Sequence, residues 1–246
     1  MPGIMAAATA GGYQERIAQL SNPGLLLDWG NTGCYAGTGT TFTNLGSTGT
    51  TNNGTLVNGP VYSSAFGGIM TVDGTDDHIQ LNNIFTLPRA AGTMMVWLRT
   101  HLAASRPFMS FHPNAFQQFI NFGGTGGVDR GETNTNCNNW NANSGANTFG
   151  AYTNIWTCLI ARTNSNLVTW FERGINQDTG SYGAINCSSG ASTIMQADVG
   201  FSMFGESTTY DGHFDGDYGV IAMWNTNLSD HQCLEAFGVY RHRYGV

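Results

Sequence analysis

The sequence predicts an all-β fold, and three observations support this. The 246 residues include 34 glycines and only 10% charged residues, a composition that produces many loops and few exposed helices. Short apolar runs, among them 25–29, 93–100 and 218–224, are separated by stretches rich in Gly, Asn and Thr, as expected for strands joined by turns. The clearest helix signals lie close to the C-terminus, at residues 229–245.

Residues 218–224 have the pattern of a strand that is buried on both faces. Side-chain alternation places Tyr218, Val220, Ala222 and Trp224 on one face and the apolar residues between them, Ile221 and Met223, on the other. Because both faces are apolar, we expect this strand to lie inside the domain and to support the segment that follows.

A short helix is predicted after this strand. Ser229 is a suitable N-cap, Gln232 three residues later completes a capping box, and Gly245 is a suitable stop. Its apolar side is predicted from helical spacing to contain Cys233, Leu234, Phe237, Tyr240 and Tyr244. Such a helix is marginal alone, so we expect it to pack on the strand.

Several motifs resemble those of laminin-G-like, or concanavalin A-like, jelly-roll domains. The run VDGTDDHIQL at 72–81 resembles a turn motif of the family, and Trp97 and Trp156 match the tryptophans of two of its strands. The strand and helix start at 214–229 resemble its closing elements, although Gln232 stands where an acidic residue is usual. Less specific matches extend the likeness from residue 25 to residue 246.

The resemblance implies a two-sheet antiparallel jelly-roll β-sandwich over residues 23–246, with one short C-terminal helix. Residues 1–22 are expected to form an N-terminal arm, in which 13–20 can make one or two helical turns. The expected core contains Leu26, Val72, Trp97, Trp156, Leu159, Phe171, Val220, Ile221, Trp224 and Phe237.

The turn at Asp73-Gly74 has the composition of a hairpin, with a strand returning through Ile79 and Leu81. Asp76 and Asp77 follow at once, so three carboxylates lie close together and calcium is an alternative to plain turn geometry. The helix-loop motif with a glutamate at its twelfth position is absent, and the sequence implies no other cofactor.

The sequence lacks the patterns of common catalytic sites, so we expect a protein without enzymatic activity. No glutamate lies in the paired arrangement of retaining glucanases, which also adopt such sandwiches. Asp215 and Asp217 are the nearest approach to a carboxylate pair, and a solvated turn is the preferred interpretation of them. The six histidines lack metal-site spacing, although His213 with Asp211 and Asp215 is an alternative ion-binding loop.

A candidate carbohydrate site lies in the Asn- and Gly-rich segment 121–150. Sugar sites combine an aromatic ring for stacking with side chains that form hydrogen bonds, and Trp140 stands beside Asn138 and Asn139. The alternative is that Trp140 fixes its own loop or that of a neighbour.

Composition limits the classes of partner. A net charge of −7 with no lysine argues against nucleic acid, and no apolar run is long enough to span a membrane. The five cysteines show no C-x-x-C spacing and are expected to be free thiols, while the N-terminus makes a poor secretory signal. Lysine is depleted from interface cores, so we expect a homo-oligomer with contacts through the arm and 121–150; compositional bias of the coding genome is the alternative.

The resemblance extends to phage structural proteins, whose closing helix ends much like Tyr240, Arg243, Tyr244 and Gly245. It implies a virion component, either a capsid decoration protein or a fibre or tail accessory subunit, whose arm contacts other virion proteins. Host polysaccharide is a further partner that this hypothesis allows. The alternative is a secreted or cell-surface carbohydrate-binding module, located outside the cell.

Overall fold

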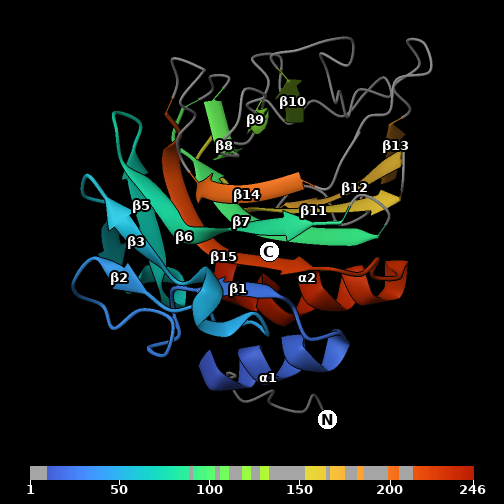
Figure 1. Cartoon of the computed structure of the whole chain (residues 1–246), viewed down its shortest axis with the longest axis horizontal. Coiled ribbons are helices and arrows are strands. Elements are labelled where there is room, and N and C mark those ends of the chain that lie inside the picture. The colour runs from blue at the N-terminus through green and yellow to red at the C-terminus, as the bar shows by residue number, and fades with distance from the viewer. Residues whose placement is uncertain are drawn as a thin grey trace.

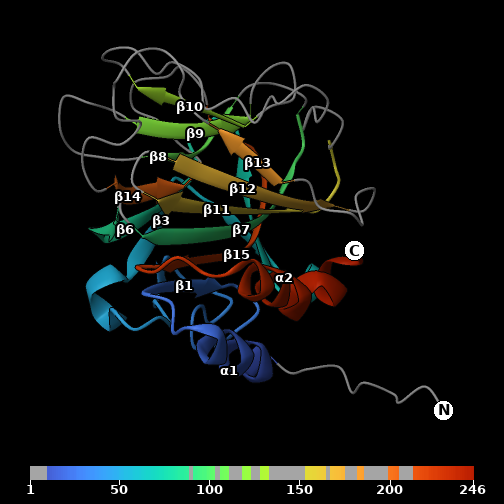
Figure 2. The ribbon, with the colours of Figure 1, turned by 90° about the vertical axis from the view of Figure 1, so that its right-hand side faces the viewer.

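The computed structural model describes residues 10–88, 91–102, 106–110, 118–122, 128–132, 153–164, 167–174, 182–185, 199–204 and 213–246. Within these residues the strands form two antiparallel sheets that pack face to face, and two helices cover the outer side of one sheet (Figures 1 and 2). The predicted all-β sandwich with a closing helix is therefore confirmed.

Sheet A is the sheet that the helices cover. Its strands run in the order β13 (Tyr182–Ile185), β12 (Leu167–Gly174), β11 (Thr157–Asn164), β7 (Gly92–Thr100), β15 (Asp215–Trp224), β5 (Ile69–Asp73) and β4 (Val61–Ser63). An eighth strand, β1 (Leu25–Asp28), pairs with the second half of β15, beyond the part that pairs with β5. One edge of β15 is thus shared by two strands.

Sheet B lies on the other side of sheet A from the helices. Its order is β10 (Val128–Glu132), β9 (Gln118–Phe122), β8 (Arg106–Ser110), β14 (Val199–Phe204), β6 (His78–Leu87), β3 (Gly54–Val57) and β2 (Thr41–Phe42). Two short 3₁₀ turns, η1 (Gly49–Asn52) and η2 (Ala65–Gly67), join strands at the periphery.

The chain buries two apolar clusters, one on each face of sheet A. The first fills the space between the sheets and includes Val72, Val96, Phe204 and Ile221. The second lies between sheet A and the helices and includes Leu26, Trp97, Trp224 and Phe237. All predicted core residues whose side chains the structure describes are buried. The side chain of the remaining one, Phe171, lies outside the description.

Helix α2 (Asp230–Tyr244) begins and ends where the sequence predicts. The Ser229 hydroxyl accepts from the Gln232 backbone N–H at 3.2 Å, and Gln232 Oε1 accepts from the Ser229 N–H at 2.8 Å. Gly245 takes the left-handed conformation, with φ of 73°. Leu234 was wrongly placed on the apolar side: it is exposed, because the helix buries the stripe through Cys233, Phe237, Tyr240 and Tyr244.

Part of the predicted arm folds as helix α1 (Ala10–Leu20), which packs on α2 (Figure 2). Ile17 is fully buried, and the rings of Tyr13 and Tyr240 lie 5.4 Å apart. The Gln232 side chain donates to the Leu20 carbonyl at 2.7 Å. Among the described helices, none has the length and hydropathy needed to cross a bilayer.

A bulge in β15 corrects the predicted facing of Tyr218. The strand is buried on both faces as expected, but its pairing with β7 shifts between Tyr218 and Val220. Gly219 is the extra residue, so Tyr218 points between the sheets while Val220, Ala222 and Trp224 face the helices. Strict alternation fails wherever one strand gains a residue over its partner.

The turn at Asp73-Gly74 forms, but the hairpin does not. Gly74 has φ of 73°, and Asp73 Oδ1 accepts from the Thr75 N–H at 2.8 Å. However, β5 pairs with β4 and β15, whereas β6 pairs with β3 and β14, so the turn carries the chain from sheet A to sheet B. The turn residues determine where the chain changes direction, whereas residues outside the turn determine which strands pair.

Candidate functional site

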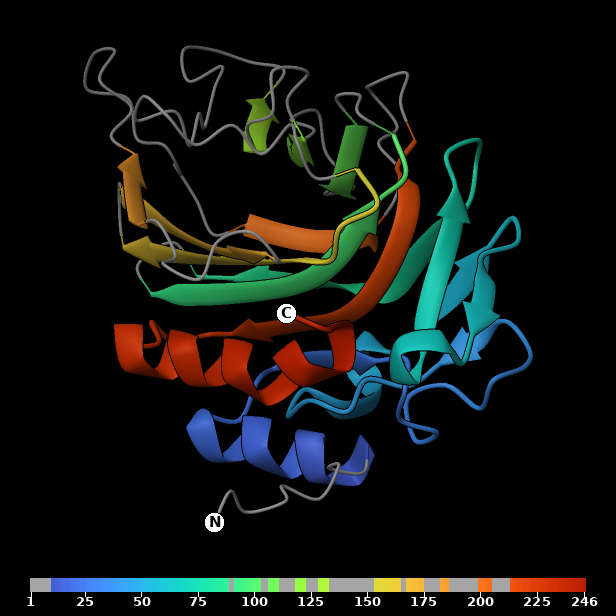
Figure 3. The ribbon, with the colours of Figure 1, turned by 180° about the vertical axis from the view of Figure 1, so that it is seen from behind.

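The outer face of sheet A changes from apolar to polar along its length. Trp97 on β7 lies beneath α2 and stacks on Tyr244 at 4.6 Å between ring centroids. Alternation places Arg99 and His101 on the same face, past the end of the helix. Figure 3 shows α2 running along β15 while β5 lies to one side of the helix. We use the term polar patch for five residues of this region. They lie on β5, on β7 or directly after it, and on β15: Thr71, Arg99, His101, Asp215 and Asp217.

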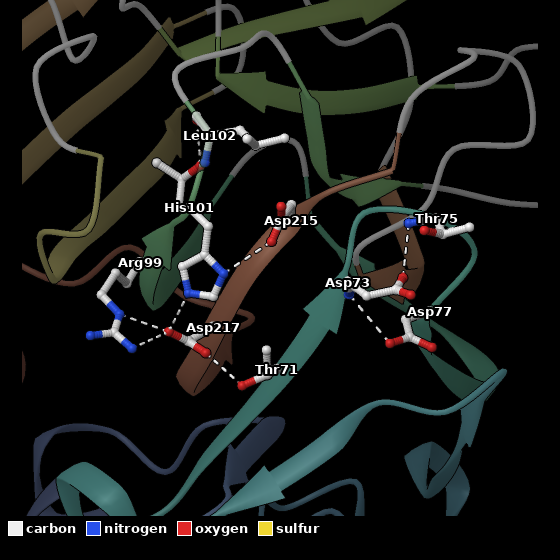
Figure 4. A network of polar contacts seen from close by, with 10 residues as sticks. Thr71, Asp73, Thr75, Asp77, Arg99, His101, Leu102, Asp215 and Asp217 are labelled. Carbon is white, nitrogen blue, oxygen red and sulfur yellow. Dashed lines mark hydrogen bonds and ion pairs between the residues drawn. The ribbon is translucent and has the colours of Figure 1, made fainter.

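Asp217 is the centre of the polar patch (Figure 4). The Thr71 hydroxyl donates to its Oδ1 at 2.6 Å, and Arg99 donates from Nε at 2.7 Å to Oδ2. Arg99 Nη2 and His101 Nε2 also approach Oδ2, at 2.6 and 3.0 Å. The interpretation of Asp217 as part of a solvated turn was wrong, because donors on the flanking elements replace water around a carboxylate that is 1% exposed.

His101 bridges the two carboxylates of β15. Its Nδ1 lies 3.0 Å from Asp215 Oδ1 and its Nε2 lies 3.0 Å from Asp217 Oδ2. Its backbone N–H also donates to the Asp215 carbonyl at 2.9 Å. Only a doubly protonated ring can donate from both nitrogens, so the neutral ring leaves one of these contacts without its proton.

Aromatic rings continue the polar patch on the side of Arg99. The guanidinium carbon lies 5.2 Å from the Phe66 ring centroid and 5.3 Å from that of Trp156, within the range of cation–π attraction. Phe66 is 38% exposed and has a left-handed backbone, with φ of 51°. Such a conformation costs a bulky residue about 1–2 kcal/mol. The Phe66 carbonyl accepts from Arg243 Nε at 2.6 Å, which helps to hold this backbone in place.

The acidic turn, Asp73, Asp76 and Asp77, adjoins the polar patch because Asp73 is the strand partner of Asp215. The ligand atoms of the three carboxylates lie within 4.8 Å of one another, and such oxygen donors suit a hard cation. The Thr75 backbone N–H lowers the pKa of Asp73, and burial followed by the charge of Asp73 raises that of Asp77. Asp77 Oδ2 accepts from the Asp73 N–H at 3.2 Å, so backbone groups already bind two of these side chains. Calcium remains an alternative here.

The two carboxylates of the polar patch on β15 differ in how far their oxygens are engaged. A glycosidase pair needs two carboxylates whose oxygens can reach a substrate. Both oxygens of Asp217 are engaged by Thr71, Arg99 and His101. Asp215 differs, because only its Oδ1 is bonded within the described residues and its side chain is 24% exposed.

The site residues predicted from the sequence, Asn138, Asn139 and Trp140, lie outside the described residues, as does Asp211. His213 is described, and its Nδ1 is buried without a hydrogen-bond partner among the residues that the structure describes. Sequence reasoning missed Phe66, Arg99 and His101. Alternation through 97, 99 and 101 was a usable signal for the last two, but nothing local indicates that β15 brings its aspartates to them.

No protein-family model and no curated protein sequence matches this chain. Among solved structures, it is similar to domain 4 of AbnA, an extracellular GH43 arabinanase from Geobacillus stearothermophilus, in complex with arabinotriose. The identity is 13%, the TM-score is 0.59, and the match covers 87% of this chain and 98% of that one.

Two further similarities cover only part of the other protein. A mutant GH54 α-L-arabinofuranosidase matches with 10% identity and a TM-score of 0.56, over 83% of this chain and 51% of that one. A Trypanosoma rangeli sialidase in complex with sialic acid matches with 8% identity and a TM-score of 0.54, over 93% of this chain and 37% of that one. This chain thus spans about half or less of these two enzymes. At such identities the likeness establishes the fold alone, in agreement with a concanavalin A-like sandwich.

Proposed function

We propose that this chain is a non-enzymatic β-sandwich module that contacts glycans. The observation that carries the proposal is the likeness to domain 4 of the arabinanase, whose structure contains arabinotriose, over nearly the full length of both chains. A fold alone does not transfer a function, so the proposal also needs suitable chemistry on this chain's own surface.

The described surface offers that chemistry. Sugar-binding sites combine aromatic rings with a few well-placed polar groups. The polar patch presents a partly exposed carboxylate, imidazole and guanidinium next to the exposed ring of Phe66. The absence of enzymatic activity is part of the proposal, and the engagement of both Asp217 oxygens supports it.

A finer proposal assigns the module to a virion, as a capsid decoration protein or a fibre or tail accessory subunit that forms homo-oligomers. Its support is the sequence resemblance at 240–245 together with the lysine-free composition. In the fold, Arg243 pairs with Asp28 and Tyr244 stacks on Trp97, so these residues attach the helix to the sheet. Co-sedimentation of the chain with particles tests this assignment, and recovery as a free secreted protein contradicts it.

Glycan binding is tested directly with the full chain. We expect binding on a glycan array that includes arabinotriose, sialylated and plant-type oligosaccharides, measured with calcium and again with EDTA. Titration calorimetry of the best ligand then gives its affinity, and incubation with that ligand should release no shorter sugar. Absence of binding to every glycan would refute the proposed function, and hydrolysis of the ligand would refute its non-enzymatic part.

A further inference from the structure

We propose that the glycan site is the surface formed by Phe66, Arg99, His101 and Asp215, and that its ligand is an uncharged saccharide. This inference rests on the proposed function and adds the site and the class of sugar. We name these four residues the saccharide surface.

The saccharide surface is continuous although its members come from three parts of the chain. The Phe66 ring lies against the Arg99 guanidinium, with 5.2 Å from its centroid to the guanidinium carbon. Arg99 and His101 meet at Asp217 Oδ2, and His101 reaches on to Asp215. Leu102, which is also exposed, follows His101 at the far end (Figure 4). Exposed apolar side chains therefore stand at both ends of a polar row.

Free donors and acceptors lie along this row. Among the described residues, Arg99 Nη1 and Asp215 Oδ2 make no hydrogen bond, while the other polar atoms of these two side chains are held by Asp217 and His101. A sugar hydroxyl both donates and accepts. Arg99 and Asp215 thus offer complementary partners for hydroxyls, in orientations fixed by contacts that do not depend on the ligand.

The local charge selects against acidic sugars. The acidic turn, Asp73, Asp76 and Asp77, adds three carboxylates beside Asp215 and Asp217. Among these groups Arg99 carries the fixed positive charge. Arg99 is itself paired with Asp217 through two of its nitrogens. A uronate or sialate would approach mainly carboxylates, whereas an uncharged sugar meets no such repulsion.

The backbone at Phe66 is strained, and Arg243 and Trp156 hold the residue in this conformation. Phe66, Gly67 and Gly68 all have positive φ, yet only the first carries a side chain. The strained backbone presents a ring that is 38% exposed rather than buried. Strain that persists at a partly exposed aromatic residue is characteristic of binding sites, where the ring serves as a stacking platform.

The test compares variants of the full chain by calorimetry with neutral trisaccharides (arabinotriose, xylotriose and maltotriose) and with trigalacturonic acid. Phe66→Ala and Asp215→Asn should each weaken binding of the preferred neutral trisaccharide at least tenfold. The matched control is Ile84→Ala, an exposed apolar residue on sheet B, which should change affinity less than twofold. Trp140→Ala should also change it less than twofold, and thermal denaturation confirms that each variant is folded.

The outcomes separate the site from the function. If the wild-type chain binds a trisaccharide and the Phe66 and Asp215 variants bind it equally well, the site is wrong and the proposed function stands. Preference for trigalacturonic acid, or loss of binding on Trp140→Ala alone, likewise overturns the inference. Binding that EDTA abolishes, but that the Phe66 and Asp215 variants both retain, also overturns the inference, because this would move the site to the acidic turn. Failure of the wild-type chain to bind any glycan on the array refutes the proposed function itself.

Discussion

Gly219 lies so close to Tyr244 that a Cβ on residue 219 would stand 2.0 Å from the tyrosine hydroxyl oxygen. Gly219 is the extra residue of the β15 bulge, and Tyr244 is the last residue of α2. The bulge therefore places a residue without a side chain where the Tyr244 ring meets the sheet.

Replacing Gly219 by Ala should destabilise the protein by about 1–3 kcal/mol, because the buried Tyr244 ring must move to make room. Equilibrium urea denaturation measures the loss. Gly238→Ala in α2 is the matched control: nothing lies within 4 Å of its added Cβ, and Ala should gain about 0.5–1 kcal/mol in a helix. Equal effects of the two substitutions would contradict the close approach.

Among the charged residues of α2, Arg243 should cause the largest loss of stability when it is replaced. Its Nη1 lies 2.5 Å from Asp28 Oδ1, both side chains are nearly or fully buried, and Arg243 also donates to the carbonyls of Phe66 and Gly68. Arg243→Met leaves Asp28 as an unpaired buried carboxylate, which should lower the free energy of unfolding by about 3–5 kcal/mol.

The control for Arg243 is an ion pair on the same helix that solvent surrounds. His231 and Glu235 approach to 3.4 Å but are both exposed, so Glu235→Gln should leave the denaturation midpoint within experimental error of wild type. An Arg243→Met protein as stable as the Glu235→Gln protein would show that the buried pair contributes nothing to stability.

Stability should decline at alkaline pH. Burial raises the pKa of Cys34 from 9.0 to about 12 and that of Cys233 to about 11. Burial also raises the pKa values of Tyr218, Tyr240 and Tyr244. Between the unfolded and folded pKa values the native state holds more protons than the unfolded chain, so the free energy of unfolding falls as pH rises.

The alkaline decline is measured by urea denaturation at intervals from pH 8 to the upper limit of reversible unfolding. Cys34→Ala should reduce the slope of stability against pH above 9, the ordinary pKa of the thiol it removes. At pH 8 the buried thiols of Cys34 and Cys233 should resist thiol reagents until the protein unfolds. A wild-type curve that stays flat through this range would contradict the buried thiols and phenols.

The buried side chain of Ile17 should contribute most to the packing of helix α1. Ile17 is fully buried against α2 whereas its neighbour Arg16 is exposed. Ile17→Ala should lower the free energy of unfolding by about 2–4 kcal/mol, as expected for truncation of a buried aliphatic side chain. Arg16→Ala should leave it nearly unchanged. If both variants behaved like wild type, α1 would not be packed on the domain in solution.

Much of the fold could be predicted because its signals are local. The Ser229–Gln232 capping box, the Gly245 stop and the turn at Gly74 depend on residues a few positions apart, and all three form. Trp97 and Trp156, which short strand motifs of the resembled family placed in the core, are both buried.

The candidate site could not be predicted in the same way, because strand pairing creates it. Asp217 is buried by Thr71 and Arg99, which lie 146 and 118 positions away in the chain. The alternation of side chains along β15 also gave no sign of the bulge at Gly219, which reversed the facing of Tyr218. The left-handed backbone at Phe66 has no sequence signal of its own, since such conformations favour glycine, and Gly67 and Gly68 follow it.

The pairing of β15 has a consequence for how the protein is made. β15 holds β7 along one edge and both β5 and β1 along the other, yet it follows all of them in the chain. While the ribosome is still producing the segment before residue 215, these strands carry unpaired backbone groups and uncovered apolar side chains. β15 is the last strand of sheet A in chain order, so the sheet closes only after residue 224 has been synthesised. Until then the open edges of β1, β5 and β7 are available to pair with other copies of the nascent chain.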